Sequence, residues 1–132
     1  MGIESVKIKK IEKSNDCIFC KIVKGELPCE KVFENKDFLA FLDIKPVVEG
    51  HTLLIPKKHF NTIMDLDKDT SQKYIEVIKE VARIIIKKYN AEGFNCSVNN
   101  GKVAGQIINH VHFHILPRKR REEKNKKELP LF

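Results

Sequence analysis

Three of the five histidines in this chain fall within five residues, at positions 110, 112 and 114 of the segment N-H-V-H-F-H-I-L-P. One apolar residue separates each histidine from the next, and this period of two is typical of a β-strand. A strand over residues 110–116 places the three imidazoles on one face and Val111, Phe113 and Ile115 toward a core. An imidazole row offers a nucleophile, a proton carrier near neutral pH or a metal ligand. The alternative is a solvated strand face that is merely rich in histidine.

The rest of the chain predicts further strands and two helices. Apolar residues at helical spacing predict a short helix over 16–25, capped by Asp16 and ended by Gly25. The same spacing predicts a long helix over 67–90, capped by Asp67 or Asp69 and ended by the segment 90–93. Two apolar runs around E-N-K-D predict a hairpin over 31–43, and residues 51–56 and 94–99 read as short strands. Short connections favour the α+β class. We expect an antiparallel sheet of about five strands with one long and one short helix, both on one face.

Composition predicts a single soluble domain whose basic surplus lies at its ends. The chain has 132 residues, 42% hydrophobic and 33% charged, with a net charge of +7. Residues 1–13 carry +2, residues 118–132 carry +4, and the body between them only +1. We therefore expect a Lys-rich lead-in over 1–13, a catalytic domain over 14–118 and a charged tail over 119–132. Because no basic face is evident, nucleic acid is not an expected partner.

The chain predicts no membrane span, because no apolar run approaches ~20 residues. We expect no secretory signal, because the first ten residues, M-G-I-E-S-V-K-I-K-K, contain no long apolar stretch. A cytoplasmic location and free thiols follow as expectations. Cys29 and Cys96 lie in apolar stretches and are expected in the core. Cys17 and Cys20 form a C-x-x-C motif that suits redox chemistry, metal binding or chance, although the thioredoxin-like setting of a redox motif is absent. Adding His59 and His110 completes a Cys₂His₂ set of the kind that binds structural zinc.

Several segments, in order, resemble the histidine triad (HIT) superfamily of nucleotide hydrolases and transferases. They are D-C-I-F-C-K-I-V-K-G-E-L-P, F-L-A-F-L-D-I-K-P, G-H-T-L-L-I-P-K-K-H-F and A-G-Q-I-I-N-H-V-H-F-H-I-L-P-R, and together they cover about residues 14 to 118. The resemblance implies a purine nucleotide substrate cleaved at its α-phosphate, and a homodimer whose two sheets join edge to edge.

The resemblance also implies roles for individual residues. His112 would attack the α-phosphorus, with its other ring nitrogen held by the carbonyl of His110, while His114 and His51 contact phosphate oxygens and the leaving group. Asn99, Gly105 and Gln106 match positions that touch phosphate, and Asp43 matches one that binds the ribose hydroxyls. The apolar base pocket would consist of Ile18, Phe19, Ile22, Phe41 and Ile44, all five of which spacing alone would assign to the core.

The resemblance further implies a structural zinc on Cys17, Cys20, His59 and His110, with no redox cofactor. His110 would then serve twice, through its side chain on the metal and its carbonyl on His112. The alternative is that the two cysteines are free thiols near the base pocket and that His59 caps a helix.

The chain departs from the family pattern at two places. The position after Gln106 often carries a polar side chain, but here it is Ile107, which donates no hydrogen bond. The chain has no tryptophan and continues H-I-L-P-R-K-R-R, more like Fhit-type or general microbial members than the Hint branch. Both nucleoside phosphoramidates and dinucleoside polyphosphates therefore stay open as substrates. The alternatives to an enzyme are a low-turnover purine-nucleotide binding module and a zinc-stabilised RNA-associated protein, the latter disfavoured because the tail lacks interleaved aromatic residues.

Overall fold

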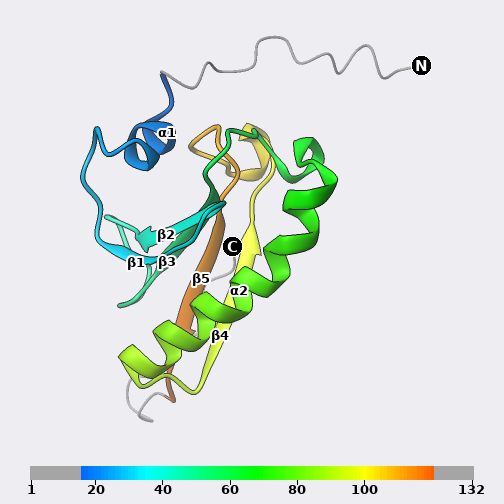
Figure 1. Ribbon diagram of the computed structural model, residues 1–132. Helices are drawn as coiled ribbons and strands as arrows, with labels where there is room; N and C mark the ends of the chain where they lie inside the picture. Colours follow the sequence, from blue (N-terminus) through cyan, green and yellow to red (C-terminus); the bar gives the residue numbers. More distant parts are fainter. Residues whose placement is uncertain (1–15, 121–132) are drawn as a thin grey trace.

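The computed structural model describes residues 16–120, in which three consecutive strands follow a short helix and two further strands follow a long one (Figure 1). The expected lead-in over 1–13 and nearly all of the expected tail over 119–132 lie outside the described residues. The elements are α1 (Ile18–Val23), β1 (Lys31–Glu34), β2 (Phe38–Leu42), β3 (Thr52–Pro56), η3 (Ile63–Asp65), α2 (Lys68–Tyr89), β4 (Gly93–Val98), η4 (Lys102–Ala104) and β5 (Phe113–Arg118). This is the predicted α+β fold. No helix in the described part of the chain has the length and apolar character to cross a membrane.

The five strands form one antiparallel sheet in the order β1-β2-β3-β5-β4. β3 lies at the centre and all five of its residues are buried, as its continuous apolar sequence predicts. β1 and β4 form the two edges of the sheet. The predicted hairpin over 31–43 is confirmed as β1 and β2, with the turn held by Asn35, whose side-chain oxygen accepts from the backbone N–H groups of Asp37 and Phe38.

The long helix α2 packs its apolar stripe on one face of the sheet, seen in front of β4 and β5 in Figure 1. Asp67 caps its start by accepting from the backbone N–H of Thr70, and Asn90 ends it in the left-handed conformation. The Tyr74 hydroxyl donates to the Leu54 carbonyl, which ties the helix to the central strand. The core on this face consists of Phe38, Ala40, Leu54, Tyr74, Val77, Ile78, Val81, Ile85 and Ile115.

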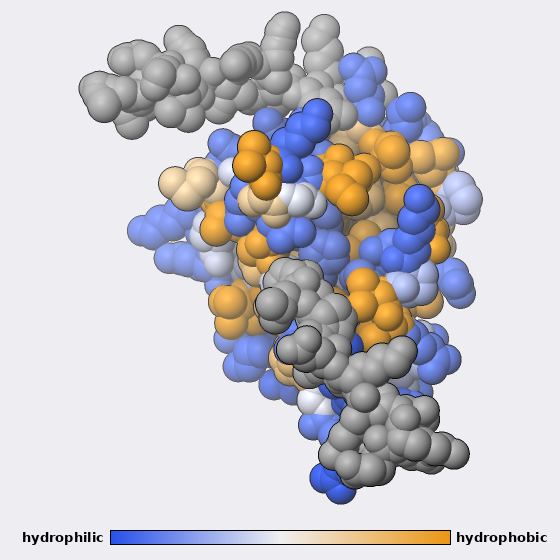
Figure 2. Space-filling view, turned by 180° about the vertical axis from the view of Figure 1, so that it is seen from behind, coloured by the Kyte–Doolittle hydropathy of each residue, from blue (hydrophilic) through white to orange (hydrophobic). Residues whose placement is uncertain are grey.

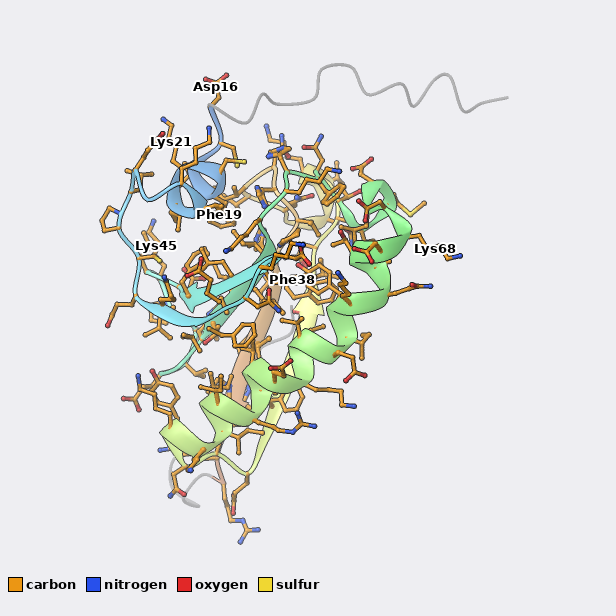
Figure 3. All side chains as sticks on the ribbon, viewed as in Figure 1. Asp16, Phe19, Lys21, Phe38, Lys45 and Lys68 are labelled. Atoms are coloured by element: carbon orange, nitrogen blue, oxygen red, sulfur yellow. The ribbon has the colours of Figure 1, made fainter. Side chains whose placement is uncertain are left out.

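The short helix α1 covers the opposite face of the sheet, so the expectation that both helices share one face is wrong. Alternation along β2 and β3 explains this, because Leu39, Phe41, Leu53 and Ile55 point away from α2 and need a second cover. Phe19 of α1 points down onto this face, whereas Phe38 points toward α2 (Figure 3). The predicted Asp16 cap is also wrong. Cys17 is the N-cap, since its sulfur accepts from the backbone N–H of Cys20, while Gly25 follows the helix with a positive φ as expected.

The strand that follows the histidines begins later than the alternation predicts. β5 runs from Phe113 to Arg118, so of the three histidines only His114 lies within it. The backbone before it turns locally, because the N–H of His110 donates to the Ile108 carbonyl at 2.8 Å. Pro117 stays inside the strand, where it pairs with Phe94. Pro56, by contrast, ends β3 as predicted.

The positions of Cys29 and Cys96 contradict the sequence-based expectation. Both side chains are exposed instead of buried in the core. Cys29 lies in the segment before β1, and Cys96 lies on the edge strand β4, where no neighbouring strand covers the outer side. No disulfide joins Cys17, Cys20, Cys29 or Cys96.

Candidate active site and metal site

His112 is held so that one ring nitrogen is left with a lone pair. Its Nδ1 lies 2.8 Å from the carbonyl oxygen of His110, and a carbonyl can only accept, so Nδ1 carries the proton. The neutral ring therefore has an unprotonated Nε2. This is the tautomer that a nucleophilic imidazole requires. The carbonyl of His110 is the acceptor that the family resemblance implies.

His51 and His114 form a second hydrogen-bonded pair. The backbone N–H of Val47 donates to Nδ1 of His51 at 3.1 Å, so the proton of neutral His51 must lie on Nε2. That N–H lies 2.9 Å from Nδ1 of His114, which accepts and leaves the His114 proton on its own Nε2. The chain of bonds thus runs from a backbone amide through two imidazoles. It ends in an N–H donor next to the His112 ring, whose centroid lies 5.1 Å from that of His114.

Asp43 joins this group from the loop after β2. One carboxylate oxygen accepts from the backbone N–H of Lys45, and the other lies 3.5 Å from Nε2 of His51. The first contact fits the simple reading of a turn residue. The second places a carboxylate beside the paired imidazoles, which a turn residue alone does not explain.

Burial keeps these histidines neutral at physiological pH. His51 and His112 are almost fully buried, and His114 is half-buried, so the predicted alternative of a solvated histidine face is wrong. Burial lowers the pKa of His114 to about 4, with a further contribution from neighbouring His112 and His51. Burial likewise lowers the pKa of His112 and of His51 below the ordinary value, against an opposing effect of Asp43. The lone pairs are therefore available at pH 7.

The five residues of the expected base pocket separate into a buried floor and an exposed rim. Phe19 and Phe41 are buried, with ring centroids 5.4 Å apart, and Ile22 is half-buried. Ile44 is 92% exposed and Ile18 is 47% exposed, so assigning all five to the core is wrong. Figure 2 shows apolar side chains gathered at the upper right of the back view, where α1 lies. Uncovered isoleucines above aromatic rings make an apolar surface of the kind that a planar base can cover.

The glycine-bearing loop is held by its own glutamine. The Gln106 side chain is 3% exposed, and its oxygen accepts from the backbone N–H of Gly101 at 2.7 Å. Its amide nitrogen donates to the carbonyls of Asn61 and Ile108. Gly105 is exposed with a positive φ, and its carbonyl accepts from the Asn99 side chain at 3.5 Å. The Gln106 side chain thus shapes the loop, which leaves exposed backbone at Gly105 as the group that can approach an anion.

Cys17, Cys20, His59 and His110 come together as predicted. Their four ligand atoms lie within 4.8 Å of one another. Nδ1 of His110 lies 3.4 Å from the sulfur of Cys17 and 3.5 Å from that of Cys20, and Nδ1 of His59 lies 3.2 Å from the sulfur of Cys20. Zinc bonds of ~2.3 Å to sulfur and ~2.0–2.1 Å to nitrogen, at tetrahedral angles, put these atoms about 3.5 Å apart. The spacing and the donor set both fit zinc.

The outer partners of the two imidazoles also fit a metal. Nε2 of His110 donates to the Pro56 carbonyl at 2.8 Å, and Nε2 of His59 lies 3.0 Å from the side-chain oxygen of Asn61. Each Nδ1 is then unprotonated and faces the thiols, as metal-bound histidine requires. The alternative that His59 caps a helix is wrong, since Thr62 caps the adjacent η3.

A second group of metal-type side chains, formed by Asp43, His51 and His114, fails the same test. Its ligand atoms also lie within 4.8 Å of one another. However, the Val47 amide forces the proton of His51 onto Nε2, the nitrogen that faces the group. Metal binding through Nε2 of His51 would need the other tautomer. The proton would then lie on Nδ1, where it would face the N–H of Val47. This group is therefore arranged for hydrogen bonding and not for a cation.

Phe19 lies between the two clusters. Its ring centroid is 5.8 Å from that of His110 and 5.2 Å from that of His112, both edge-on. The helix that supplies both cysteines therefore also packs against the candidate nucleophile.

Three supporting groups were not predicted from the sequence. They are the Val47 amide, the Pro56 carbonyl and Asn61. Backbone partners leave no trace in residue types. Asn61 had one signal, its position two residues after His59, which suits a side chain that orients a neighbouring imidazole.

A family model for the HIT domain matches residues 24–121 of this chain. The chain belongs to the HIT family. The match begins after the C-x-x-C motif, so Cys17 and Cys20 precede the matched range.

Relatives and solved structures agree with this membership. The chain is 43% identical over 106 residues to an adenosine 5′-monophosphoramidase of Schizosaccharomyces pombe, covering 80% of this chain and 77% of the relative. It is 40% identical over 116 residues to an adenylylsulfatase of Arabidopsis thaliana, covering 88% of this chain but 59% of that longer protein. A crystal structure of a HIT family member from Bacillus subtilis superposes with a TM-score of 0.77 at 38% identity, covering 89% of this chain and 83% of the other.

Proposed function

We propose that this protein is a nucleotide hydrolase or transferase that cleaves purine nucleotide conjugates at the α-phosphate through a nucleotidyl-His112 intermediate. One observation carries the proposal. The His110 carbonyl holds the proton of His112 on Nδ1 and leaves a lone pair on Nε2, beside a hydrogen-bond chain that gives His114 a free N–H. The relatives named as a monophosphoramidase and an adenylylsulfatase both act on adenylyl conjugates by name, which supports this substrate class.

The proposed reaction has two displacements at phosphorus. Nε2 of His112 attacks the α-phosphorus, and the bond from phosphorus to the leaving group breaks with its electron pair going to the leaving group. Water then attacks the phosphorus of the nucleotidyl-imidazole, the P–N bond breaks with its electron pair returning to Nε2, and the proton that water loses is released to solvent. The N–H of His114 donates to the charge that develops at phosphate oxygens, or to the departing atom.

The remaining site residues have binding roles in this proposal. The aromatic floor of Phe19 and Phe41, with the rim of Ile18, Ile22 and Ile44, takes the base, and Asp43 accepts from the ribose hydroxyls. Asn99 and the exposed backbone at Gly105 contact phosphate, while Gln106 holds the loop in shape through its internal hydrogen bonds.

We further propose that Cys17, Cys20, His59 and His110 hold a structural zinc ion. Bound zinc would neutralise two thiolates with all four coordination positions filled by protein, so it supplies stability and not a reacting water. The four residues join α1 to the loop before β5. Their contribution to the reaction is to fix the His110 backbone, whose carbonyl orients His112.

A homodimer joined through β4 is also proposed. The outer edge of β4 has no charged residue in Gly93–Val98, whereas β1 carries Lys31 and Glu34 at the other edge. Charged side chains protect an edge strand from pairing and their absence leaves it open, so β4 is the edge that suits a second sheet.

The test of the hydrolase compares wild type with His112→Asn on adenosine 5′-phosphoramidate and on a dinucleoside polyphosphate. We expect wild type to turn over at least one of them and the variant to lose at least about 10³-fold in kcat. Retained AMP binding shows that the variant is folded. If wild type cleaves neither substrate yet binds AMP, the hydrolase proposal fails. The better account is then a low-turnover nucleotide-binding module, for which the exposed Ile107, with no hydrogen-bonding side chain, is the favouring observation.

A further inference from the structure

A hollow beside the glycine-bearing loop contains an amine that the proposed reaction does not yet use. Its lining consists of Lys102, Gly105, Gln106, Ile107 and Asn109, and its volume is about 360 Å³. Small-molecule sites typically have ~300–1,000 Å³. None of the three triad histidines lines the hollow. It nevertheless shares Gly105 with the expected phosphate contacts, and Asn109 directly precedes His110, whose carbonyl orients the nucleophile.

The ammonium group of Lys102 has no carboxylate partner among the described residues. Other lysines of this chain do form ion pairs, such as Lys57 with Glu34 and Lys73 with Asp37 and Asp69. Residues 93–118 contain no Asp or Glu at all. The N–H of Ile63 in η3 donates to the Asn100 side chain, and Asp65 of η3 accepts from the N–H and hydroxyl of Thr62. The hollow therefore presents an uncompensated positive charge.

The rest of the lining offers little to a neutral leaving group. Ile107 is 88% exposed and donates no hydrogen bond, and the Gln106 side chain is engaged inside the protein. Only the amide of Asn109 and the amine of Lys102 are polar side chains that face solvent there. A free cation beside an apolar side chain favours an anion over a neutral amine.

We propose that Lys102 makes this protein select conjugates with an anionic leaving group, such as the polyphosphate part of a dinucleoside polyphosphate. This inference rests on the proposed function. When the bond from the α-phosphorus to a bridging oxygen breaks, the electron pair goes to that oxygen, and the leaving phosphate departs as an anion that needs no proton. Lys102 stabilises this developing charge, which interacts with a cation more strongly than the intact bond does. An amine leaving group takes a proton instead and gains nothing from a neighbouring ammonium.

The experiment measures kcat/KM for diadenosine tetraphosphate and for adenosine 5′-phosphoramidate in wild type, Lys102→Gln and Lys102→Glu. Lys36→Gln is the matched control, because it also removes an exposed charge, from the turn between β1 and β2, near the opposite edge of the sheet. We expect Lys102→Gln to lower kcat/KM for the tetraphosphate about tenfold and Lys102→Glu to lower it more, with the phosphoramidate changed less than about twofold. Raising the ionic strength should shrink the difference between the two substrates in wild type.

Each other outcome is decisive. If both substrates respond equally to the Lys102 variants, or if neither responds, the leaving-group inference is overturned while the hydrolase proposal stands. If Lys36→Gln matches Lys102→Gln, the effect comes from overall charge, and the inference is again wrong. If wild type cleaves neither substrate, it is the proposed function itself that fails.

Discussion

Gly50 controls the position of His51 without being a reacting group. Its φ is +89°, and an added Cβ would lie 2.7 Å from the Tyr89 ring and 2.8 Å from Pro117. We expect Gly50→Ala to lower the free energy of unfolding by about 2–5 kcal/mol, combining ~1–2 kcal/mol for the left-handed backbone with ~1–3 kcal/mol for overpacking. Turnover should fall as well, because His51 follows directly and orients His114.

Gly25→Ala is the matched control for this prediction. Gly25 has a φ of +82°, but nothing lies within 4 Å of an added Cβ. Only the backbone cost of ~1–2 kcal/mol should appear in urea unfolding, with turnover unchanged. Equal losses of stability in the two variants would show that the packing of Tyr89 against Gly50 is unimportant.

His114 makes stability depend on pH in a predictable direction. Burial lowers its pKa to about 4, whereas an unfolded histidine has a pKa of about 6.5. Below about 6.5 the unfolded chain takes up a proton that the folded chain does not, so stability falls as pH drops from about 6.5 toward 4. Urea unfolding at a series of pH values should show a shallower decline for His114→Gln than for wild type. Parallel curves would mean that His114 is not a neutral, buried group in the folded protein.

We expect helix α1 to depend on the Cys₂His₂ cluster, because six residues with no acidic side chain in the first turn form a marginal helix alone. We expect one zinc ion per chain in the purified protein. Stripping it with a chelator, or replacing Cys20 with Ser, should lower Tm by about 10 °C, the shift that corresponds to the ~2.7 kcal/mol gained at a metal concentration 100-fold above Kd.

The exposed cysteine Cys29 supplies the control for the zinc prediction. Cys29→Ser lies outside the cluster and should keep both the zinc content and the Tm. Wild type without zinc, or a chelator that leaves Tm unchanged, would overturn the structural role of the metal.

The helices and strands differ in how accurately their bounds could be predicted from the sequence. α2 was predicted within a residue of each end, since one amphipathic stripe and two capping residues all point to the same helix. β5 was predicted too early, because alternation shows which side each residue faces and not where pairing starts. The backbone N–H of His110 donates to the Ile108 carbonyl, and the His110 carbonyl accepts from the His112 ring, so His110 does not pair with a neighbouring strand. Helix α1 lies on the opposite face because β2 has apolar side chains on both of its faces, and α2 covers only one of them. Which helix covers which face becomes clear only in the assembled sheet.

The candidate site was predictable where residue types carry the chemistry. Cys17, Cys20, His59 and His110 form one cluster, and Asp43, His51 and His114 form another. The family resemblance implied the tautomer of His112. Those of His51 and His110 were not predictable, because the Val47 amide and the Pro56 carbonyl set them, and backbone groups cannot be recognised from residue types. Cys29 and Cys96 were assigned to the core from apolar neighbours. Cys29 precedes β1 and Cys96 lies on an edge strand, and apolar neighbours in the sequence do not show whether the fold covers a side chain.

For the whole molecule, the uncharged edge at β4 predicts the oligomeric state. Sedimentation of wild type should give twice the mass of one chain. Cys96→Lys should shift it to a monomer, because the new charge lies on the pairing edge, whereas Cys29→Lys adds the same charge elsewhere and should leave the dimer intact. A wild type that sediments as a single chain at micromolar concentration contradicts the edge-joined dimer.

The central claim is that His112 forms a covalent nucleotidyl intermediate, and the stereochemistry at phosphorus tests it most directly. A substrate with a single-configuration phosphorothioate at the α-position would be hydrolysed in ¹⁸O-labelled water and the configuration of the product determined. Two in-line displacements, first by His112 and then by water, invert phosphorus twice, so our account predicts overall retention. Overall inversion would mean that water attacks the substrate directly, and His112 would then be no more than a binding or acid–base residue.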